Sequence, residues 1–149
     1  MTQVLAVVGA IGVIASMVFA GWQSREVAKQ TKIQNALAGS SSLTETLNAL
    51  HNILGMMVDR PDLRPFFYDG IACPTDGPLR NSVLTIAEML ADVAETGILV
   101  HYQVRTTASI EDWNDYVDFL LRSSPTVTSV IHSHPLWYPR LKERLPSAL

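Results

Sequence analysis

The chain contains a single cysteine, Cys73, among its 149 residues. One cysteine excludes an intrachain disulfide, so the sequence has no disulfide framework of the kind found in small secreted proteins. Charge is also missing from part of the chain, because residues 2–24 contain no Asp, Glu, Lys or Arg. A solvated surface helix would carry a charged face, and the front of the chain has none.

The uncharged stretch is long enough to cross a bilayer. Residues 4–22 read VLAVVGAIGVIASMVFAGW. In a helix these residues rise about 28 Å, roughly the hydrocarbon thickness of a membrane. Backbone groups in lipid must bond internally, so a lone apolar segment is expected to be helical. The sequence therefore predicts a transmembrane helix over residues 1–24.

A cleaved signal peptide is the competing interpretation of the same stretch. Val18-Phe19-Ala20 would suit a signal peptidase. However, no Lys or Arg precedes the apolar run, and the run exceeds the usual length of about 7–15 residues. These two features favour a retained anchor.

The charges that flank the stretch predict its orientation. Arg25, Lys29 and Lys32 follow it against one acid, Glu26. Positive flanks stay in the cytoplasm, so we expect the N-terminus outside the cell membrane and the main domain inside. Trp22 fits an anchor at the headgroup level. The basic segment over residues 25–42 either sets this topology, which we favour, or also contacts anionic lipid at about 1 kcal/mol per charge.

Small residues recur every four positions within the anchor, at Gly12, Ser16 and Ala20. Such a stripe lets a second helix approach closely. The alternative is that Gly and Ala are simply common in membrane helices.

The rest of the chain is acidic. Three of the 11 basic residues and one of the 14 acidic residues lie in residues 25–32, which leaves eight basic and thirteen acidic residues after them. A nucleic-acid-binding domain needs a basic footprint, so nucleic acid is not an expected partner.

Apolar residues at alternating three- and four-residue steps predict a long helix that leaves the membrane and ends near residue 58. This heptad seam consists of Ile33, Ala36, Ser40, Leu43, Leu47, Leu50, Leu54 and Met57. It resembles a coiled-coil seam and runs through the polar residues 39–42. The alternative is a break at Gly39, after which Ser42 or Thr44 would cap a second helix.

The remaining pattern is helical as well. It predicts one or two short turns over residues 61–68, a loop over 70–78, and helices over 78–106, 109–123, 125–133 and from Pro135 onward. No stretch shows sustained strand alternation. The predicted fold is all-α: a transmembrane helix that continues into a small cytoplasmic helical bundle over residues 43–149.

No arrangement of residues predicts catalysis, a cofactor or a metal site. No nucleophile motif or phosphate loop is present. His132 and His134 point apart on a helix and so cannot share an ion unless the segment is irregular. Glu111, Asp112, Asp115 and Asp118 cluster in one helix, where a solvated face is favoured over a cation or partner site. The sequence predicts a protein that is not an enzyme.

Two aromatic clusters remain, Phe66, Phe67 and Tyr68, and Trp137 with Tyr138. We expect them to close the ends of the bundle, because aromatic side chains bury large areas. If exposed, they are the candidate partner surface.

Several segments together resemble a group of short actinobacterial single-pass membrane proteins. These are QTKIQ at 30–34, RPFFYDG at 64–70, LTIAEM at 84–89, Asp112-Trp113 with Tyr116, and HPLWYP at 134–139. The resemblance covers nearly the whole chain. It implies one N-terminal helix and a cytoplasmic helical domain, and it transfers no catalytic residue.

The expected function is that of a membrane-anchored protein-interaction or structural subunit. Its expected partners are membrane lipid and either a second copy of the chain or another membrane protein. The alternative is a membrane-anchored ligand sensor or enzyme with a pocket between the helices. A third possibility is a lipid-surface protein that binds through its basic segment.

Overall fold

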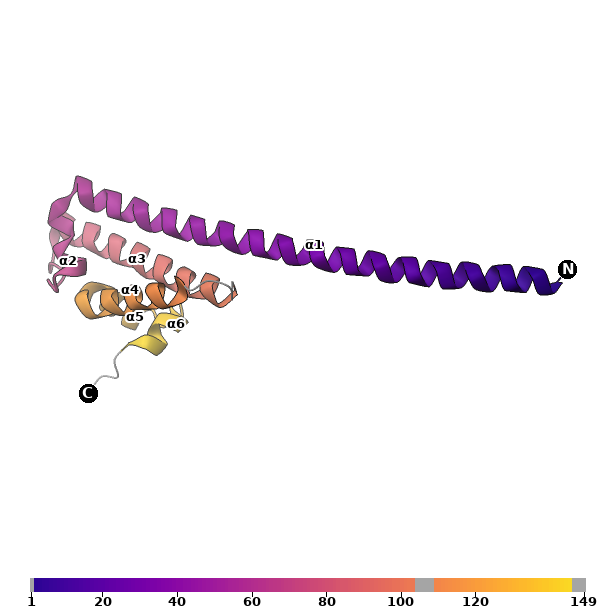
Figure 1. Cartoon of the computed structure of the whole chain (residues 1–149). Coiled ribbons are helices and arrows are strands. Elements are labelled where there is room, and N and C mark those ends of the chain that lie inside the picture. Colours follow the sequence, from indigo (N-terminus) through magenta and orange to yellow (C-terminus); the bar gives the residue numbers. More distant parts are fainter. Residues whose placement is uncertain (1, 104–108, 146–149) are drawn as a thin grey trace. The chain divides into compact units, whose positions relative to one another are not determined.

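A computed structural model describes residues 2–103 and 109–145, without the side chains of residues 2–11, 36, 103, 109 and 110. Every regular element over these residues is a helix, which confirms the prediction of an all-α fold. In chain order they are α1 (Thr2–Asp59), the 3-10 helix η1 (Pro61–Leu63), α2 (Pro65–Tyr68), α3 (Gly77–Gln103), α4 (Ser109–Ser123), α5 (Pro125–Ser133) and α6 (Pro139–Arg144) (Figure 1).

The chain divides into two compact units, residues 1–38 and residues 39–149, and α1 contributes to both. The second unit begins at Gly39, inside the segment predicted to lie next to the membrane. The helix assignment continues through residues 39–42. Just after these residues, the Thr44 hydroxyl donates to the Ser40 carbonyl at 3.0 Å and the Thr46 hydroxyl donates to the Ser42 carbonyl at 2.9 Å. Thr44 therefore bonds back to the preceding turn and does not cap a new helix.

In the first unit, every side chain that the structure describes is exposed. The large apolar ones are Val13, Ile14, Met17, Val18, Phe19, Trp22, Val27, Ile33 and Leu37. Taken over the described residues, none of the helices has a stretch both long and apolar enough to pass through a bilayer. The side chains of residues 4–11, which form the front of the predicted span, lie outside that description.

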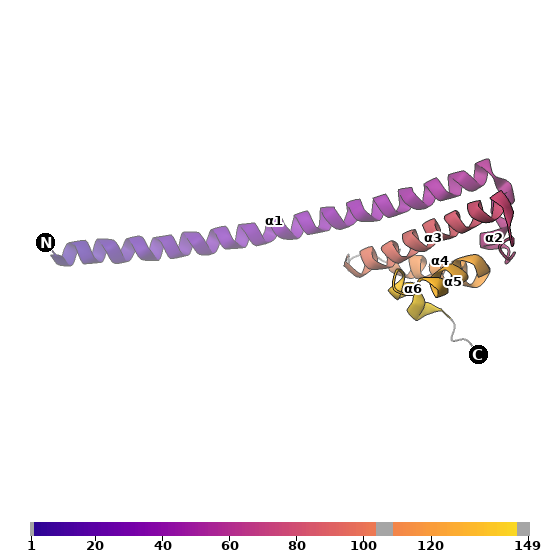
Figure 2. The same cartoon turned by 180° about the vertical axis from the view of Figure 1, so that it is seen from behind.

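In the second unit, α3 packs against α4, α5 and α6, and α5 also packs against α2 and α4 (Figures 1 and 2). The far end of the α1 seam joins this core through Leu50 and Met57, and Ile53, which lies outside the seam, is buried beside them. Leu47 is 38% exposed and Ile33 is 60% exposed. The seam is therefore buried only over its last turns.

The boundaries of α4 and α5 agree with the sequence prediction, because Ser and Pro at their ends are strong local signals. Ser124 is the N-cap of α5, and its side chain accepts a hydrogen bond from the Val127 N–H. The predicted end of α3 at residue 106 falls outside the described residues.

The prediction that the last helix starts at Pro135 is wrong. Residues 135–137 form a turn, and α6 begins at Pro139. The residue before a proline avoids the helical region, and Tyr138 has φ −126° and ψ 58°. A helix that started at Pro135 could not pass through Tyr138.

Side chains tie the short elements to the core. Ser123 and Ser124 donate to the carbonyls of Phe67 and Phe66, both at 2.9 Å. The Glu95 carboxylate of α3 accepts the Leu141 N–H at 3.0 Å and the Arg140 N–H at 3.1 and 3.2 Å. Negative charge at a helix N-terminus is favourable, so Glu95 anchors the start of α6.

Candidate functional site

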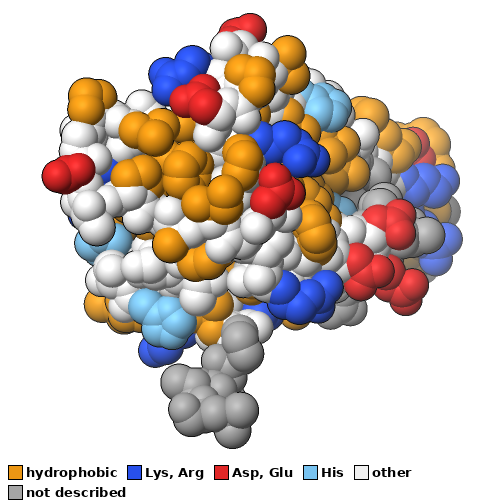
Figure 3. Space-filling model, turned by 90° about the vertical axis from the view of Figure 1, so that its left-hand side faces the viewer, with side chains coloured by type: hydrophobic (Ala, Val, Ile, Leu, Met, Phe, Trp, Pro, Cys, Tyr) orange, Lys and Arg blue, Asp and Glu red, His pale blue; other side chains and the backbone are white. Residues whose placement is uncertain are grey.

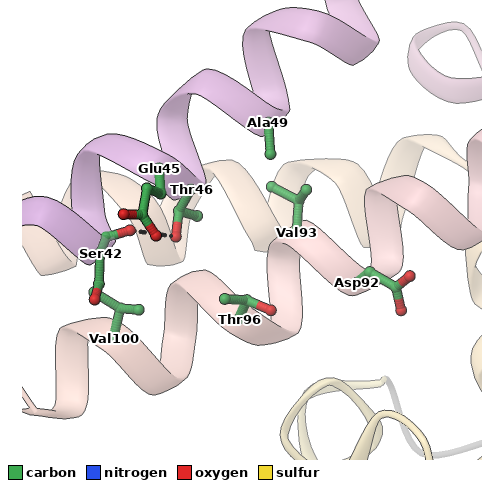
Figure 4. A pocket seen from close by; sticks show the side chains of 8 residues that line it. All are labelled: Ser42, Glu45, Thr46, Ala49, Asp92, Val93, Thr96 and Val100. Carbon is green, nitrogen blue, oxygen red and sulfur yellow. Dashed lines mark hydrogen bonds between the residues drawn. The ribbon is translucent and has the colours of Figure 1, made fainter.

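Three hollows in the second unit are candidate binding sites. The first is a groove of about 320 Å³ between the second half of α1 and α3, lined by Ser42, Glu45, Thr46, Ala49, Asp92, Val93, Thr96 and Val100 (Figure 4). Ala49, Val93 and Val100 supply the apolar part of its lining. Glu45 and Asp92 lie far apart along the groove and do not converge on one point (Figure 4). The groove therefore does not hold a carboxylate pair for acid–base work.

The second hollow has a volume of about 250 Å³ and lies beside Trp113. Its walls are mainly apolar and come from Leu43, Leu47, Leu50, His101, Asp112, Trp113 and Tyr116. The imidazole of His101 stacks on the Trp113 indole, with ring centroids 5.8 Å apart. Its Nδ1 lies 2.7 Å from the Gly97 carbonyl. Since a carbonyl only accepts, that nitrogen carries the proton. His101 is thus fixed by packing.

The third hollow, which we call the Cys73 cavity, has a volume of about 420 Å³. It lies between the loop after α2, the first turns of α3 and the start of α5. Its polar lining comes from Cys73, Thr75, Arg80, Thr126 and Ser129. Arg80 is the one charged side chain in this lining, so the cavity is basic in character.

Three of the five aromatic residues named as a candidate partner surface lie in the core. Phe67 is fully buried, and Phe66 and Tyr138 are 9% and 2% exposed. These three side chains cannot form a partner surface in this fold. Tyr68 is half-buried and bonds its hydroxyl to that of Tyr116 at 3.1 Å. Trp137 is 62% exposed and stacks on His134 with ring centroids 4.0 Å apart.

The four acidic residues of α4 differ in their exposure and in their contacts. Glu111, Asp112 and Asp115 are exposed. Asp118 pairs with Arg144 of α6, whose Nη2 lies 2.8 Å from Oδ1. This pair links two helices, which is a structural role.

The two histidines near the C-terminus do not form a joint site. His132 is exposed, and its Nδ1 lies 2.8 Å from the Thr128 carbonyl. His134 is the C-cap of α5. Over the part of the chain that the structure describes, no group of three His, Cys, Asp or Glu residues could hold a metal ion.

The predicted anchor residues lie along the first unit. The stripe of Gly12, Ser16 and Ala20 is exposed, and the Ser16 hydroxyl donates to the Gly12 carbonyl at 2.8 Å. Trp22 lies beside Phe19, with ring centroids 6.1 Å apart.

The basic residues of the segment that follows the stripe are also exposed: Arg25, Lys29 and Lys32. Lys29 forms a 3.6 Å ion pair with Glu26. The helix therefore presents the small-residue stripe and the basic segment to its surroundings.

Sequence reasoning missed the polar residues of the Cys73 cavity, Arg80, Thr126 and Ser129. They belong to no motif, and they meet only because α5 packs on α3. The sequence indicated only that α5 starts here, because Ser124-Pro125 is typical of a helix N-terminus.

No protein-family model, curated protein or solved structure matches this chain. On the face of the second unit seen from the side of α2, acidic, basic and hydrophobic side chains are interspersed (Figure 3). The exposed helix of the first unit and the hollows of the second unit are therefore the features of this chain that point to a function.

Proposed function

We propose that this protein is a single-pass membrane-anchored subunit that binds other proteins or a second copy of itself. Residues 1–24 cross the cell membrane with the N-terminus outside, and the helical bundle lies in the cytoplasm. The observation that carries the proposal is the uncharged helix at the front of the chain. Its described large side chains are exposed and apolar, among them Met17 and Val18, each 69% exposed.

Lipid tails would remove these apolar side chains from water. Each Å² of apolar surface removed from water contributes about 25 cal/mol, and the chain itself leaves this surface open. The positive flank at Arg25, Lys29 and Lys32 supports the inward orientation of the main domain. Trp22 supports a boundary at the headgroup level.

The small-residue stripe supports pairing of the membrane helices. Gly12, Ser16 and Ala20 leave little side chain between two helix backbones. The Ser16 hydroxyl is satisfied within its own helix by the Gly12 carbonyl. The stripe can therefore meet another apolar helix without leaving this hydroxyl unpaired.

Anchoring and orientation are tested together by labelling. Cys73 is the only cysteine, so a membrane-impermeant maleimide reports one position. We expect the chain to remain in the pellet after a carbonate wash, and Cys73 to react only after lysis. A Gln3→Cys, Cys73→Ser variant is the matched control and should react in intact cells. Recovery of the intact chain in the carbonate supernatant, or labelling of Cys73 from outside, would overturn the proposal.

Self-association is tested by crosslinking and native mass spectrometry of the full chain in mild detergent. We expect an oligomer or a co-purifying partner, and Gly12→Leu with Ser16→Leu should weaken that association. Val13→Leu, which adds bulk outside the stripe, is the control. A strictly monomeric chain without a partner would count against the interaction role.

A second candidate function is a membrane-anchored ligand sensor. The Cys73 cavity favours it, because its volume of about 420 Å³ falls in the usual range of small-molecule sites. The interaction role and a ligand site in the bundle are compatible, since they use different parts of the chain.

A further inference from the structure

The part of α1 that follows the basic residues has few charges for a helix in water. Over residues 33–58, Glu45 is the only Asp, Glu, Lys or Arg. The described side chains of residues 33–38 are all exposed, and Leu37 is 66% exposed. A solvated helix normally carries charged residues on its outer face. This stretch therefore resembles a helix that another surface covers.

The same stretch is also poor in helix-forming residues. Gly39 and the serines at 40–42 favour the helix less than alanine does, glycine by about 1 kcal/mol. Isolated helices are marginal in water, and most helical stability in proteins comes from the packing of an apolar face. A partner helix along this stretch would supply that packing.

Apolar side chains recur on this stretch with the spacing of a coiled coil. Steps of four and three residues connect Ile33, Leu37, Ser40, Thr44 and Leu47, which are all exposed and which we call the exposed face. The Thr44 hydroxyl donates to the Ser40 carbonyl at 3.0 Å, so it has a partner within its own helix. Glu45 lies outside this spacing. The exposed face can therefore be covered without burying a charge.

We propose that two copies of the chain pair through the exposed face, as a parallel coiled coil over residues 33–47. This pairing rests on the proposed anchor, which gives every copy the same direction and places the same residue at the same depth from the membrane. In such a pair, each seam position meets its counterpart. Ile33, Leu37 and Leu47 then meet apolar side chains.

The residues that flank the exposed face favour a second copy as its occupant. In a coiled coil, charges at these flanking positions set the choice of partner. The flanking residues here are uncharged: Gln34, Ala36, Ser41, Leu43 and Asn48. No like charges meet when two copies pair, and a charged helix of another protein would gain no ion pair there.

The apolar surface continues into the bundle at Leu47. This side chain is 38% exposed, and it also lines the apolar hollow beside Trp113 of α4. Leu43 lines the same hollow. A second α1 along the exposed face would reach the edge of this hollow, and it would remove further apolar surface from water.

Disulfide trapping in native membranes tests this pairing. In a Cys73→Ser background, Leu37→Cys and Leu47→Cys each place a single thiol on the exposed face. Asn35→Cys is the matched control, because it is exposed and lies outside the seam spacing. A disulfide needs Cα atoms about 4.4–6.8 Å apart, so trapping reports which positions face each other. Oxidation with copper phenanthroline is followed by non-reducing electrophoresis.

We expect Leu37→Cys and Leu47→Cys to give disulfide-linked dimers and Asn35→Cys to remain largely monomeric. Leu37→Glu should weaken the dimer about tenfold or more, since it removes apolar contacts and brings two like charges together. Asn35→Glu adds the same charge outside the exposed face and should dimerise as wild type. Native mass spectrometry of the full chain in mild detergent measures both variants.

Equal trapping at positions 35 and 37, or no trapping at 37 and 47, would overturn the pairing. Wild-type dimerisation of Leu37→Glu would do so as well. A different co-purifying protein without trapped dimers would overturn the pairing and support the broader interaction role. The carbonate wash reports anchoring separately, so a chain that stays in the membrane without trapping overturns the pairing alone.

Discussion

The indole of Trp113 in α4 lies directly on the backbone of Gly97 in α3. A Cβ at position 97 would overlap the Cε2 and Cζ2 atoms of that ring. One turn further along α3, His101 stacks on the same indole at an interplanar angle of 16°. The glycine thus creates the space in which α4 docks on α3.

We predict that Gly97→Ala destabilises the bundle although alanine is the better helix former. Helix propensity alone would favour alanine by about 1 kcal/mol. Displacing a buried indole from a packed core costs about 1–3 kcal/mol or more, so the net effect should be a loss. Urea unfolding of the full chain in mild detergent, followed by circular dichroism, measures it.

Gly55→Ala is the matched control, because a Cβ at Gly55 meets nothing within 4 Å. It should leave the free energy of unfolding unchanged or raise it by up to about 1 kcal/mol. Equal stability of the two variants would show that the Trp113 contact is not a constraint.

We also predict that Glu95→Ala loosens α6. The Glu95 carboxylate is buried and accepts the N–H groups of Arg140 and Leu141. Hydrogen bonds to a charged group contribute about 1.5–3 kcal/mol, so the loss of unfolding free energy should lie in that range. Glu95→Gln should cost less, since the amide oxygen still accepts.

The readout for Glu95 is hydrogen exchange of the α6 amides beside global unfolding. Glu143→Gln, an exposed acid on the same helix, should change neither. Unchanged protection of α6 in Glu95→Ala would contradict the anchoring role.

Ser124→Ala should destabilise the junction of α2 and α5. Ser124 is fully buried, donates to the Phe66 carbonyl and accepts from the Val127 N–H. Its removal leaves a buried acceptor and a helix N–H unpaired, which should cost about 2 kcal/mol. Ser133→Ala, at an exposed position on α5, is the control for thermal unfolding and should cost little.

The sequence predicted the helices whose ends carry local signals. Ser124-Pro125 marks the start of α5, which begins at residue 125 as predicted. The sequence prediction misplaced α6, although the restriction that Pro139 places on Tyr138 is a local signal that would have excluded a helix starting at Pro135.

The packing partners of the helices could not be predicted. Nothing in the sequence around Gly97 shows that Trp113 covers it. Arg80 and Thr126 both line the Cys73 cavity, and only the packing of α5 on α3 brings them to the same place. Periodicity reports which face of a helix is apolar, and it does not report which helix meets that face.

The last prediction concerns alkaline pH. Burial raises the pKa of Tyr138 to about 12, and the negative charges of Asp92 and Glu88 add to the increase. An unfolded tyrosine titrates near pH 10, so the folded state holds this proton more tightly. The resulting stability is complete below about pH 10 and is lost as the pH rises toward about 12. Burial also raises the pKa of Tyr116, which acts in the same direction.

Tyr138→Phe should therefore flatten the fall of unfolding free energy with pH, measured by urea unfolding between about pH 8 and about pH 11.5. Tyr102→Phe, at a 60% exposed position, should leave the wild-type slope. Ultraviolet titration at the tyrosinate band gives an independent check, because the variant should lose one late-titrating phenol. An identical slope in wild type and Tyr138→Phe would show that the Tyr138 hydroxyl titrates as it does in the unfolded chain.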